Sequence, residues 1–171
     1  YLTHGFWAMS KEEELPCPGI SAVMLKSMED VTERVLEGVT KETSNDERAE
    51  IVTANIKKIK EEAEANSDYQ VIIKSFYHGN KYYMIYNEVF KDVRMVGAPP
   101  SNIGKFGGDT DNWVWPRHTG DFSVFRIYVS PDGKAADYSE DNVPYTPNYH
   151  FPISLKGANE GDFTFVFGYP A

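Results

Sequence analysis

The chain has 171 residues, of which 41% are hydrophobic and 14% aromatic, a composition that excludes a disordered tail. Its 17 Lys and Arg residues against 26 Asp and Glu residues yield a formal net charge of −9, which argues against a nucleic-acid partner because phosphate binding needs a basic surface. No apolar run approaches the roughly 20 residues that cross a bilayer. No Lys/Arg cluster indicates a membrane surface either, so we expect no membrane partner.

The ends and the single cysteine carry further expectations. The chain begins with Tyr1 rather than Met and stops directly after a strand-like run, so we expect an internal piece of a longer protein. Cys17 stands between two prolines with no histidine nearby in the sequence. It is predicted to be a packed thiol rather than a nucleophile or a metal ligand.

The first elements are a short strand and a helical pair. Residues 20–25 form an apolar run that predicts a strand. The helical pair is predicted over about residues 27–65, and its first helix begins at Ser27 as the N-cap. The second begins at Ser44, whose partner in a capping box is Glu47. Apolar residues at helical spacing then form one stripe, so we expect this helix to lie on a neighbouring sheet: Ala49, Val52, Ile56, Ile59 and Ala63.

After the helices the apolar pattern changes to that of strands. Residues 69–76, 82–90 and 92–96 are rich in β-branched and aromatic side chains and predict an antiparallel β-meander, with a turn at 78–80. Residues 122–129 and 163–167 predict two further buried strands. The fold class is therefore mainly β with inserted helices, and periodicity alone leaves barrel or sandwich open.

Residues 97–121 differ from the rest of the chain. They hold five glycines, three prolines and the two tryptophans Trp113 and Trp115. Such a loop is costly to order and is usually functional. A phosphate loop is excluded because Gly104-Lys105 is followed by Phe106 rather than Ser or Thr. Asp109 and Asp111 alternate as calcium ligands can, but EF-hand spacing is absent, so we predict neither a metal nor a cofactor.

A complete Ser-His-Asp triad is not expected within these 171 residues. His118 stands only three residues from Asp121, and no Gly-x-Ser-x-Gly element is present to offer a serine beside oxyanion-hole amides. If Asp121 is catalytic, its histidine lies outside this chain.

Three runs carry a resemblance to a known family. Residues 93–100 read VRMVGAPP, residues 104–113 read GKFGGDTDNW and residues 115–122 read WPRHTGDF. Together with the opening YLT and GFWA and the closing FGYP, they resemble the bacterial dipeptidyl-peptidase 7 and 11 family of serine exopeptidases over essentially the whole chain. Val114 stands where many members have Met, a departure without chemical consequence.

The resemblance implies a fold and an activity. It implies that residues 1–171 are part of a chymotrypsin-like double β-barrel, mostly the first barrel, with residues 27–65 as a helical insertion. It also implies a periplasmic or secreted protein of a Gram-negative bacterium, which acts without a cofactor and removes dipeptides from the free N-terminus of peptides. The family's triad runs His, Asp, Ser, and Asp121 matches the Asp, while the other two lie outside the chain. Asn112 and Trp113 match residues that line the pocket for the substrate's amine.

The chemistry of these residue types agrees with the implied roles. A triad Asp orients a histidine and stabilises its imidazolium, and Asp121 is placed for this directly before a predicted strand. An ammonium group needs oxygen acceptors and is attracted to an aromatic face, which Asn112 and Trp113 can supply. The alternative is a non-catalytic peptide- or glycan-binding domain that uses the loop around Trp113. Arg117 and His118 are interpreted as structural.

Partners and solution behaviour follow from the same resemblance. The implied partner is a peptide with a free N-terminus, and the intact protein is expected to be a homodimer. Half of a double barrel exposes apolar strand faces, so the chain by itself is expected to self-associate and to be inactive.

Overall fold

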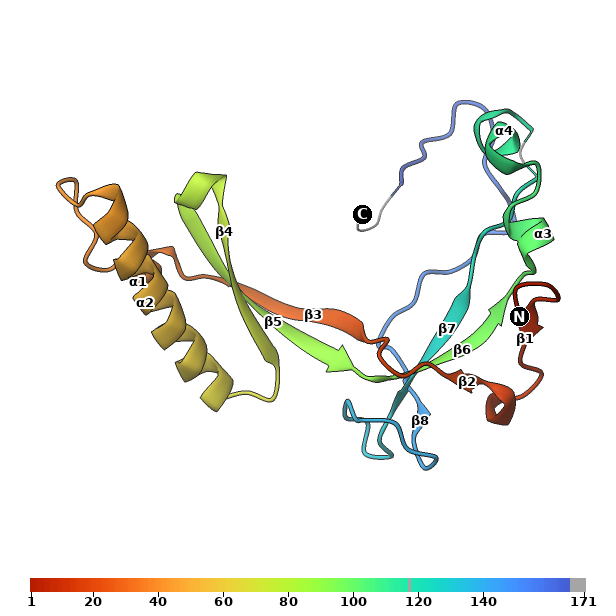
Figure 1. Cartoon of the computed structure of the whole chain (residues 1–171), viewed down its shortest axis with the longest axis horizontal. Helices are drawn as coiled ribbons and strands as arrows, with labels where there is room; N and C mark the ends of the chain where they lie inside the picture. The colour runs from red at the N-terminus through yellow and green to blue at the C-terminus, as the bar shows by residue number, and fades with distance from the viewer. Residues whose placement is uncertain (117, 167–171) are drawn as a thin grey trace.

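The computed structural model describes residues 1–116 and 118–166, and for Asp111 and Asn112 the backbone alone. Within these residues, two antiparallel sheets are joined by a long ribbon of strands (Figure 1). The first sheet, called the platform sheet here, has the order β1-β6-β7-β8, and β2 also pairs with β6. Its strands are β1 (Phe6–Trp7), β2 (Leu15–Pro16), β6 (Asp92–Ala98), β7 (Val124–Val129) and β8 (Val143–Pro144).

The second sheet and two helices form a helical lobe at residues 22–90, at the opposite end of the molecule from α3 and α4 (Figure 1). Its strand order is β3-β5-β4, with bounds Ala22–Asp30, Lys81–Phe90 and Gln70–Phe76. The described helices are α1 (Thr32–Val35), α2 (Asn45–Ala65), α3 (Ser101–Gly104) and α4 (Gly108–Trp113), with 3₁₀ turns at Lys11–Glu13 and Tyr77–Gly79. The predicted fold class, mainly β with inserted helices and antiparallel strands, is confirmed.

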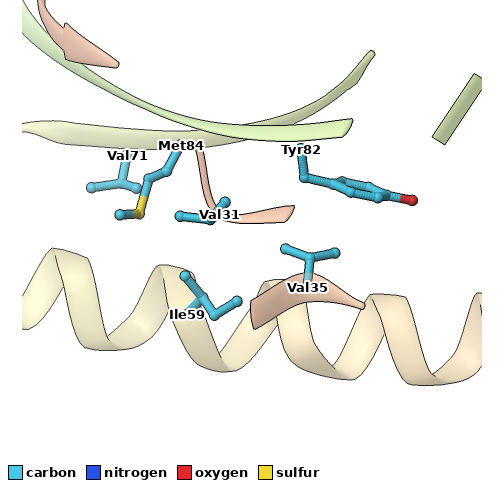
Figure 2. Close-up of a cluster of buried hydrophobic side chains, with 6 residues drawn as sticks. All are labelled: Val31, Val35, Ile59, Val71, Tyr82 and Met84. Atoms are coloured by element: carbon cyan, nitrogen blue, oxygen red, sulfur yellow. The ribbon is translucent and has the colours of Figure 1, made fainter. Parts of the chain in front are cut away.

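The core of the helical lobe lies between α2 and one face of its sheet (Figure 2). Side chains from β4 and β5 point toward Ile59 of α2, with α1 closing the space between them. The buried members are Val31, Val35, Ile59, Val71, Tyr82 and Met84. Burial of each such aliphatic side chain stabilises the fold by about 1.5–3 kcal/mol.

The prediction for α2 is confirmed in its start and in its buried face. The Glu47 backbone N–H donates to the Ser44 hydroxyl, and the Ser44 backbone N–H donates to the Glu47 carboxylate, which completes the capping box. Of the predicted apolar stripe, Ile59 is buried, and Val52, Ile56 and Ala63 pack against the core cluster. The helix therefore lies on a sheet, as expected.

The predicted start of the first helix, at Ser27, is wrong. Residues 27–30 continue strand β3 and pair with β5, with Ser27 opposite Tyr86 and Asp30 opposite Tyr83. The helix α1 begins only at Thr32, whose backbone N–H donates to the Asp30 carboxylate at 2.9 Å. Pairing along β5 outweighs a local helical pattern because each residue of the strand gains a cross-strand partner.

The β-meander is confirmed only for its first two strands. β4 and β5 form the predicted hairpin around Tyr77–Gly79. β6 does not pair with β5. It follows β5 after Lys91 alone and joins the platform sheet, where it pairs with β1, β2 and β7.

The two last predicted strands also differ from the structure. β7 begins at Val124 rather than residue 122, and its first residues, Val124 and Phe125, are exposed while its last two are buried. Residues 163–166 form no strand and are highly exposed, and Phe167 lies outside the described residues. An apolar run becomes a strand only where a partner strand satisfies its backbone, and 163–166 pair with none of the described strands.

One face of the helical lobe is apolar and exposed. It is the sheet face that carries Val23, Leu25, Met28, Ile72 and Ile85, around a depression of about 420 Å³. This exposure agrees with the expectation that an isolated chain self-associates, which stays a prediction. Among the described residues, no helix is both long and apolar enough to cross a membrane.

An acid-dependent contact closes the turn between β3 and α1. The Lys81 ammonium group donates to Asp30 Oδ2 at 2.8 Å, and this bond, with those from Thr32, lowers the pKa of the Asp30 carboxyl from 3.8 to about 2. The folded-state pKa is depressed, so the stabilisation is complete above about pH 4 and is lost as the pH falls through 2. We expect the difference in urea midpoint between the full-length protein and its Asp30→Asn variant to shrink over this window. A constant difference from pH 5 to pH 2 would contradict the assignment.

Candidate functional site

The segment predicted as a functional loop, residues 97–121, contains two short helices that lie together beyond one end of the platform sheet (Figure 1). α3 follows Pro99-Pro100, whose fixed φ suits the start of a helix. α4 begins after Gly107, which has φ 69°, a left-handed conformation that favours glycine. Gly107 therefore lets the chain turn sharply between α3 and α4.

Asp121 is held at the root of this segment by the turn around α3. The backbone N–H of Gly120 donates to the Ile103 carbonyl at 3.1 Å, and the Thr119 hydroxyl donates to the Phe106 carbonyl at 2.8 Å. A Cβ on Gly104 would lie 3.9 Å from the Asp121 Cα. The backbone of Asp121 thus lies against α3 through contacts on its N-terminal side.

The Asp121 side chain is exposed, and β7 begins three residues later. An exposed carboxylate on a backbone fixed by hydrogen bonds can accept a hydrogen bond from a group that approaches from outside the described residues. A triad Asp accepts such a bond from its histidine, so the catalytic role of Asp121 stays a prediction.

Asn112 and Trp113 lie at the end of α4. Trp113 is 78% exposed and Trp115 is 84% exposed, so two indole rings stand uncovered in this segment. For Asn112 the structure describes only the backbone, so its predicted amide contact stays a prediction. The structure places these two residues on α4 and Asp121 beside α3, on separate parts of one segment (Figure 1).

Arg117 and His118 are the two residues interpreted as structural, and the structure describes one of them. His118 is exposed and lies edge-on to Phe106, with ring centroids 6.0 Å apart, and its structural role stays a prediction. Arg117 lies outside the described residues. In the described part of the chain, no group of three or more His, Cys, Asp or Glu side chains is placed to hold a metal ion.

A network of charged side chains, most of them buried, joins strands β6 and β7 of the platform sheet. Arg94 on β6 stands opposite Arg126 on β7, and each has a carboxylate partner. Asp92 accepts two hydrogen bonds from Arg94, at 2.9 and 2.8 Å, and Glu14 accepts one from Arg126 at 2.8 Å. The Arg94 guanidinium also lies 3.7 Å from the centre of the Tyr128 ring.

This network perturbs the pKa values of several of its members, among them Asp92 and Tyr128. Burial alone would raise the pKa of the Asp92 carboxyl, but hydrogen bonds from Arg94 and Asn142 outweigh burial and lower it. Burial and the hydrogen bond to Glu14 raise the pKa of Tyr128 to about 12. Both groups therefore keep a single charge state across the physiological range, as expected of structural groups rather than of proton-transfer groups.

Sequence reasoning missed the contact of Trp7 with Gly97 and with Phe122, the residue that follows Asp121. Trp7 on β1 lies over Gly97 of β6, and its ring also meets Phe122, with ring centroids 6.1 Å apart. A lone glycine inside a strand pattern, as in residues 93–98, signals a close approach to the backbone and could have identified this contact.

Comparison with known proteins places the chain in a family. The sequence profile described as Peptidase S46 matches residues 1–171, the whole chain. The chain belongs to the peptidase S46 family. This S46 chain is 53% identical over 170 residues to an Asp/Glu-specific dipeptidyl-peptidase of Capnocytophaga gingivalis, and 45% identical over 170 residues to a dipeptidyl-peptidase 7 of the same organism. In both matches it covers 99% of its own length and 24% of the relative's.

Solved structures agree with this placement. The S46 chain matches Porphyromonas endodontalis DPP11 in complex with the dipeptide Arg-Glu, with a TM-score of 0.75 and 44% identity, over 95% of this chain and 25% of that one. A structure of the same protein in complex with substrate matches with a TM-score of 0.75 and 45% identity. The S46 chain thus spans about a quarter of the length of these relatives, and the resemblance found in its sequence is confirmed.

Proposed function

We propose that the full-length protein that contains this chain is a serine-type dipeptidyl-peptidase, which releases dipeptides from the free N-terminus of peptides. The observation that carries the proposal is the Peptidase S46 match over residues 1–171, together with relatives that are named as dipeptidyl-peptidases. The non-catalytic binding domain loses support, because every relative named above is called a peptidase.

In this proposal, Asp121 is the acid of a His-Asp-Ser triad. The histidine and the serine come from polypeptide outside residues 1–171. Asp121 accepts a hydrogen bond from one ring nitrogen of the histidine, so that the other nitrogen can take the serine proton as the acyl-enzyme forms. The exposure of Asp121 and its fixed backbone support this role.

Asn112 and Trp113 form the proposed pocket for the substrate's ammonium group. The amide oxygen of Asn112 accepts a hydrogen bond from the ammonium group, and the indole face of Trp113 attracts its charge. The exposed ring of Trp113 leaves room for a ligand beside it. A pocket for the free amine at a fixed distance from the nucleophile makes the enzyme cut after the second residue.

The wider setting belongs to the same proposal. The curled platform sheet is part of the first barrel of a chymotrypsin-like double β-barrel, and the intact protein is a periplasmic homodimer. The match to DPP11 over 95% of this chain supports a shared architecture.

The test uses the full-length protein and a set of pentapeptides. We expect dipeptide release, detected by mass spectrometry, from peptides with a free N-terminus and none from the same peptides after N-acetylation. Peptides with an acidic and with a hydrophobic second residue are both included, because the preference at the second residue is left open by the sequence. Equal cleavage of free and acetylated peptides, or no cleavage of either, would refute the proposal.

A further inference from the structure

Trp7 occupies the space that a side chain at residue 97 would need. In the pairing of β1 with β6, Trp7 stands directly opposite Gly97. A Cβ on Gly97 would lie 2.3 Å from Cε3 and 2.6 Å from Cζ3 of the Trp7 ring, which is closer than real Cβ atoms approach. The indole therefore rests on bare backbone, and covering a strand glycine with an aromatic ring is a known way to hold a sheet in register.

The same ring reaches the residue that follows Asp121. The Trp7 and Phe122 rings have centroids 6.1 Å apart and planes inclined at 53°, a range in which aromatic pairs attract each other. Gly97 also stands opposite Val124, the first residue of β7, at a register shift between Met95 and Gly97. One glycine thus brings β1 and the start of β7 together.

Asp121 is therefore held from both sides. On its N-terminal side, Gly120 and Thr119 are bonded to the turn around α3. On its C-terminal side, the described ring contact of Phe122 is the one with Trp7. Without the Trp7 ring, Phe122 would lose this aromatic contact, and the next support of the Asp121 backbone on this side would be the pairing of Val124 with Gly97.

We propose that Trp7, seated on Gly97, is a positioning residue for Asp121: its ring holds Phe122 and thereby fixes the carboxylate. The inference rests on the proposed function, in which Asp121 orients the catalytic histidine. The effect of Trp7 is on geometry, and a misplacement of about 1 Å in a catalytic group costs about 10²-fold in rate.

The test measures kcat and KM of the full-length protein on a chromogenic dipeptide amide. We expect Trp7→Ala to lower kcat by about 10- to 100-fold while KM changes by less than about threefold. Trp7→Phe retains a ring and should recover most of the loss. Gly97→Ala should resemble Trp7→Ala, because the added methyl group displaces the indole.

A double-mutant cycle tests whether Trp7 and Gly97 act through the same contact. In Gly97→Ala with Trp7→Ala the methyl group has room, so the double variant should be no slower than either single variant, whereas independent effects would multiply. The control is Phe76→Ala, which removes an edge-on aromatic pair with Tyr83, at a centroid distance of 5.3 Å, in the helical lobe. It should leave kcat within about twofold, since it lies on the lobe remote from α3 (Figure 1).

The outcomes distinguish this inference from the proposed function. If Asp121→Asn abolishes turnover but Trp7→Ala and Gly97→Ala keep kcat within about twofold, the inference alone is overturned. If Asp121→Asn leaves turnover unchanged, the proposed function fails and the inference fails with it. Should Trp7→Ala not fold, Trp7→Leu and Gly97→Ala answer the same question, because both remove the aromatic contact and keep an apolar or small residue.

Discussion

Asp121→Asn in the full-length protein is expected to lower kcat by about 10⁴-fold, with a small change in KM. The amide keeps the size of the carboxylate, but it has no negative charge to stabilise an imidazolium and can hold the histidine in the wrong tautomer. Asp121→Ala should show a similar loss. Both are measured by steady-state hydrolysis of a chromogenic dipeptide amide.

The matched control is Asp109→Asn, which makes the same chemical change on α4 of the same segment. Asp109 is exposed and precedes the predicted amine pocket by three residues. Its variant should keep kcat within about twofold, as surface substitutions usually do. Equal losses in the two variants would mean that the charge of the whole segment matters rather than the Asp121 carboxylate, and would remove Asp121 from the triad.

Asp92→Ala is expected to destabilise the platform sheet by about 3–5 kcal/mol. Asp92 is 1% exposed and accepts two hydrogen bonds from Arg94, which is itself 8% exposed. Removal of the carboxylate leaves a buried guanidinium without its counter-charge, and burial of an unpaired charge is among the costliest single changes. Amide hydrogen exchange in β6 and β7, measured by mass spectrometry, should be about 10²- to 10⁴-fold faster.

Asp137→Ala is the control for this second experiment. Asp137 forms an ion pair with Lys91 at 3.0 Å, but its side chain is 81% exposed. An exposed pair contributes about 0–1 kcal/mol, so exchange in β6 and β7 should change by less than about tenfold. Similar exchange rates in the two variants would show that the Asp92–Arg94 pair is not a major stabilising contact.

The sequence predicts best those elements whose signals are local. The capping box of Ser44 and Glu47 and the apolar stripe ending near Ala63 describe α2 almost completely, because both depend on residues within a few turns of each other. The β4–β5 hairpin is predicted for the same reason, since two β-rich runs flank a short turn.

The errors occur where distant residues decide the structure. Residues 27–30 have a helical pattern but pair with β5, more than 50 residues later in the chain, and no local signal reports that pairing. Residues 163–166 have strand composition but no strand partner among the described residues. In both cases the backbone conformation follows from which hydrogen-bond partners the tertiary structure supplies.

The residues of the candidate site can be predicted from the sequence, but the packing contacts around them cannot. Glycines, tryptophans and a family resemblance identify Asp121, Asn112 and Trp113 from sequence. The contact of Trp7 with Gly97 and Phe122 joins three segments that are far apart in the sequence, so it becomes visible only once β1 is placed beside β6.

The chain enters and leaves the helical lobe at neighbouring points of the platform sheet. β2 runs beside β6, and the backbone N–H of Cys17 still donates to the Val93 carbonyl at 2.9 Å, so the excursion starts and finishes at neighbouring points. A short hairpin turn could bridge these two points without moving either strand. The Tyr145 ring lies 5.0 Å from the Phe90 ring at the base of the lobe. A protein that lacks the lobe would lose this contact and would need another side chain to cover Tyr145. The platform sheet therefore has a geometry that could tolerate the loss or exchange of the whole lobe.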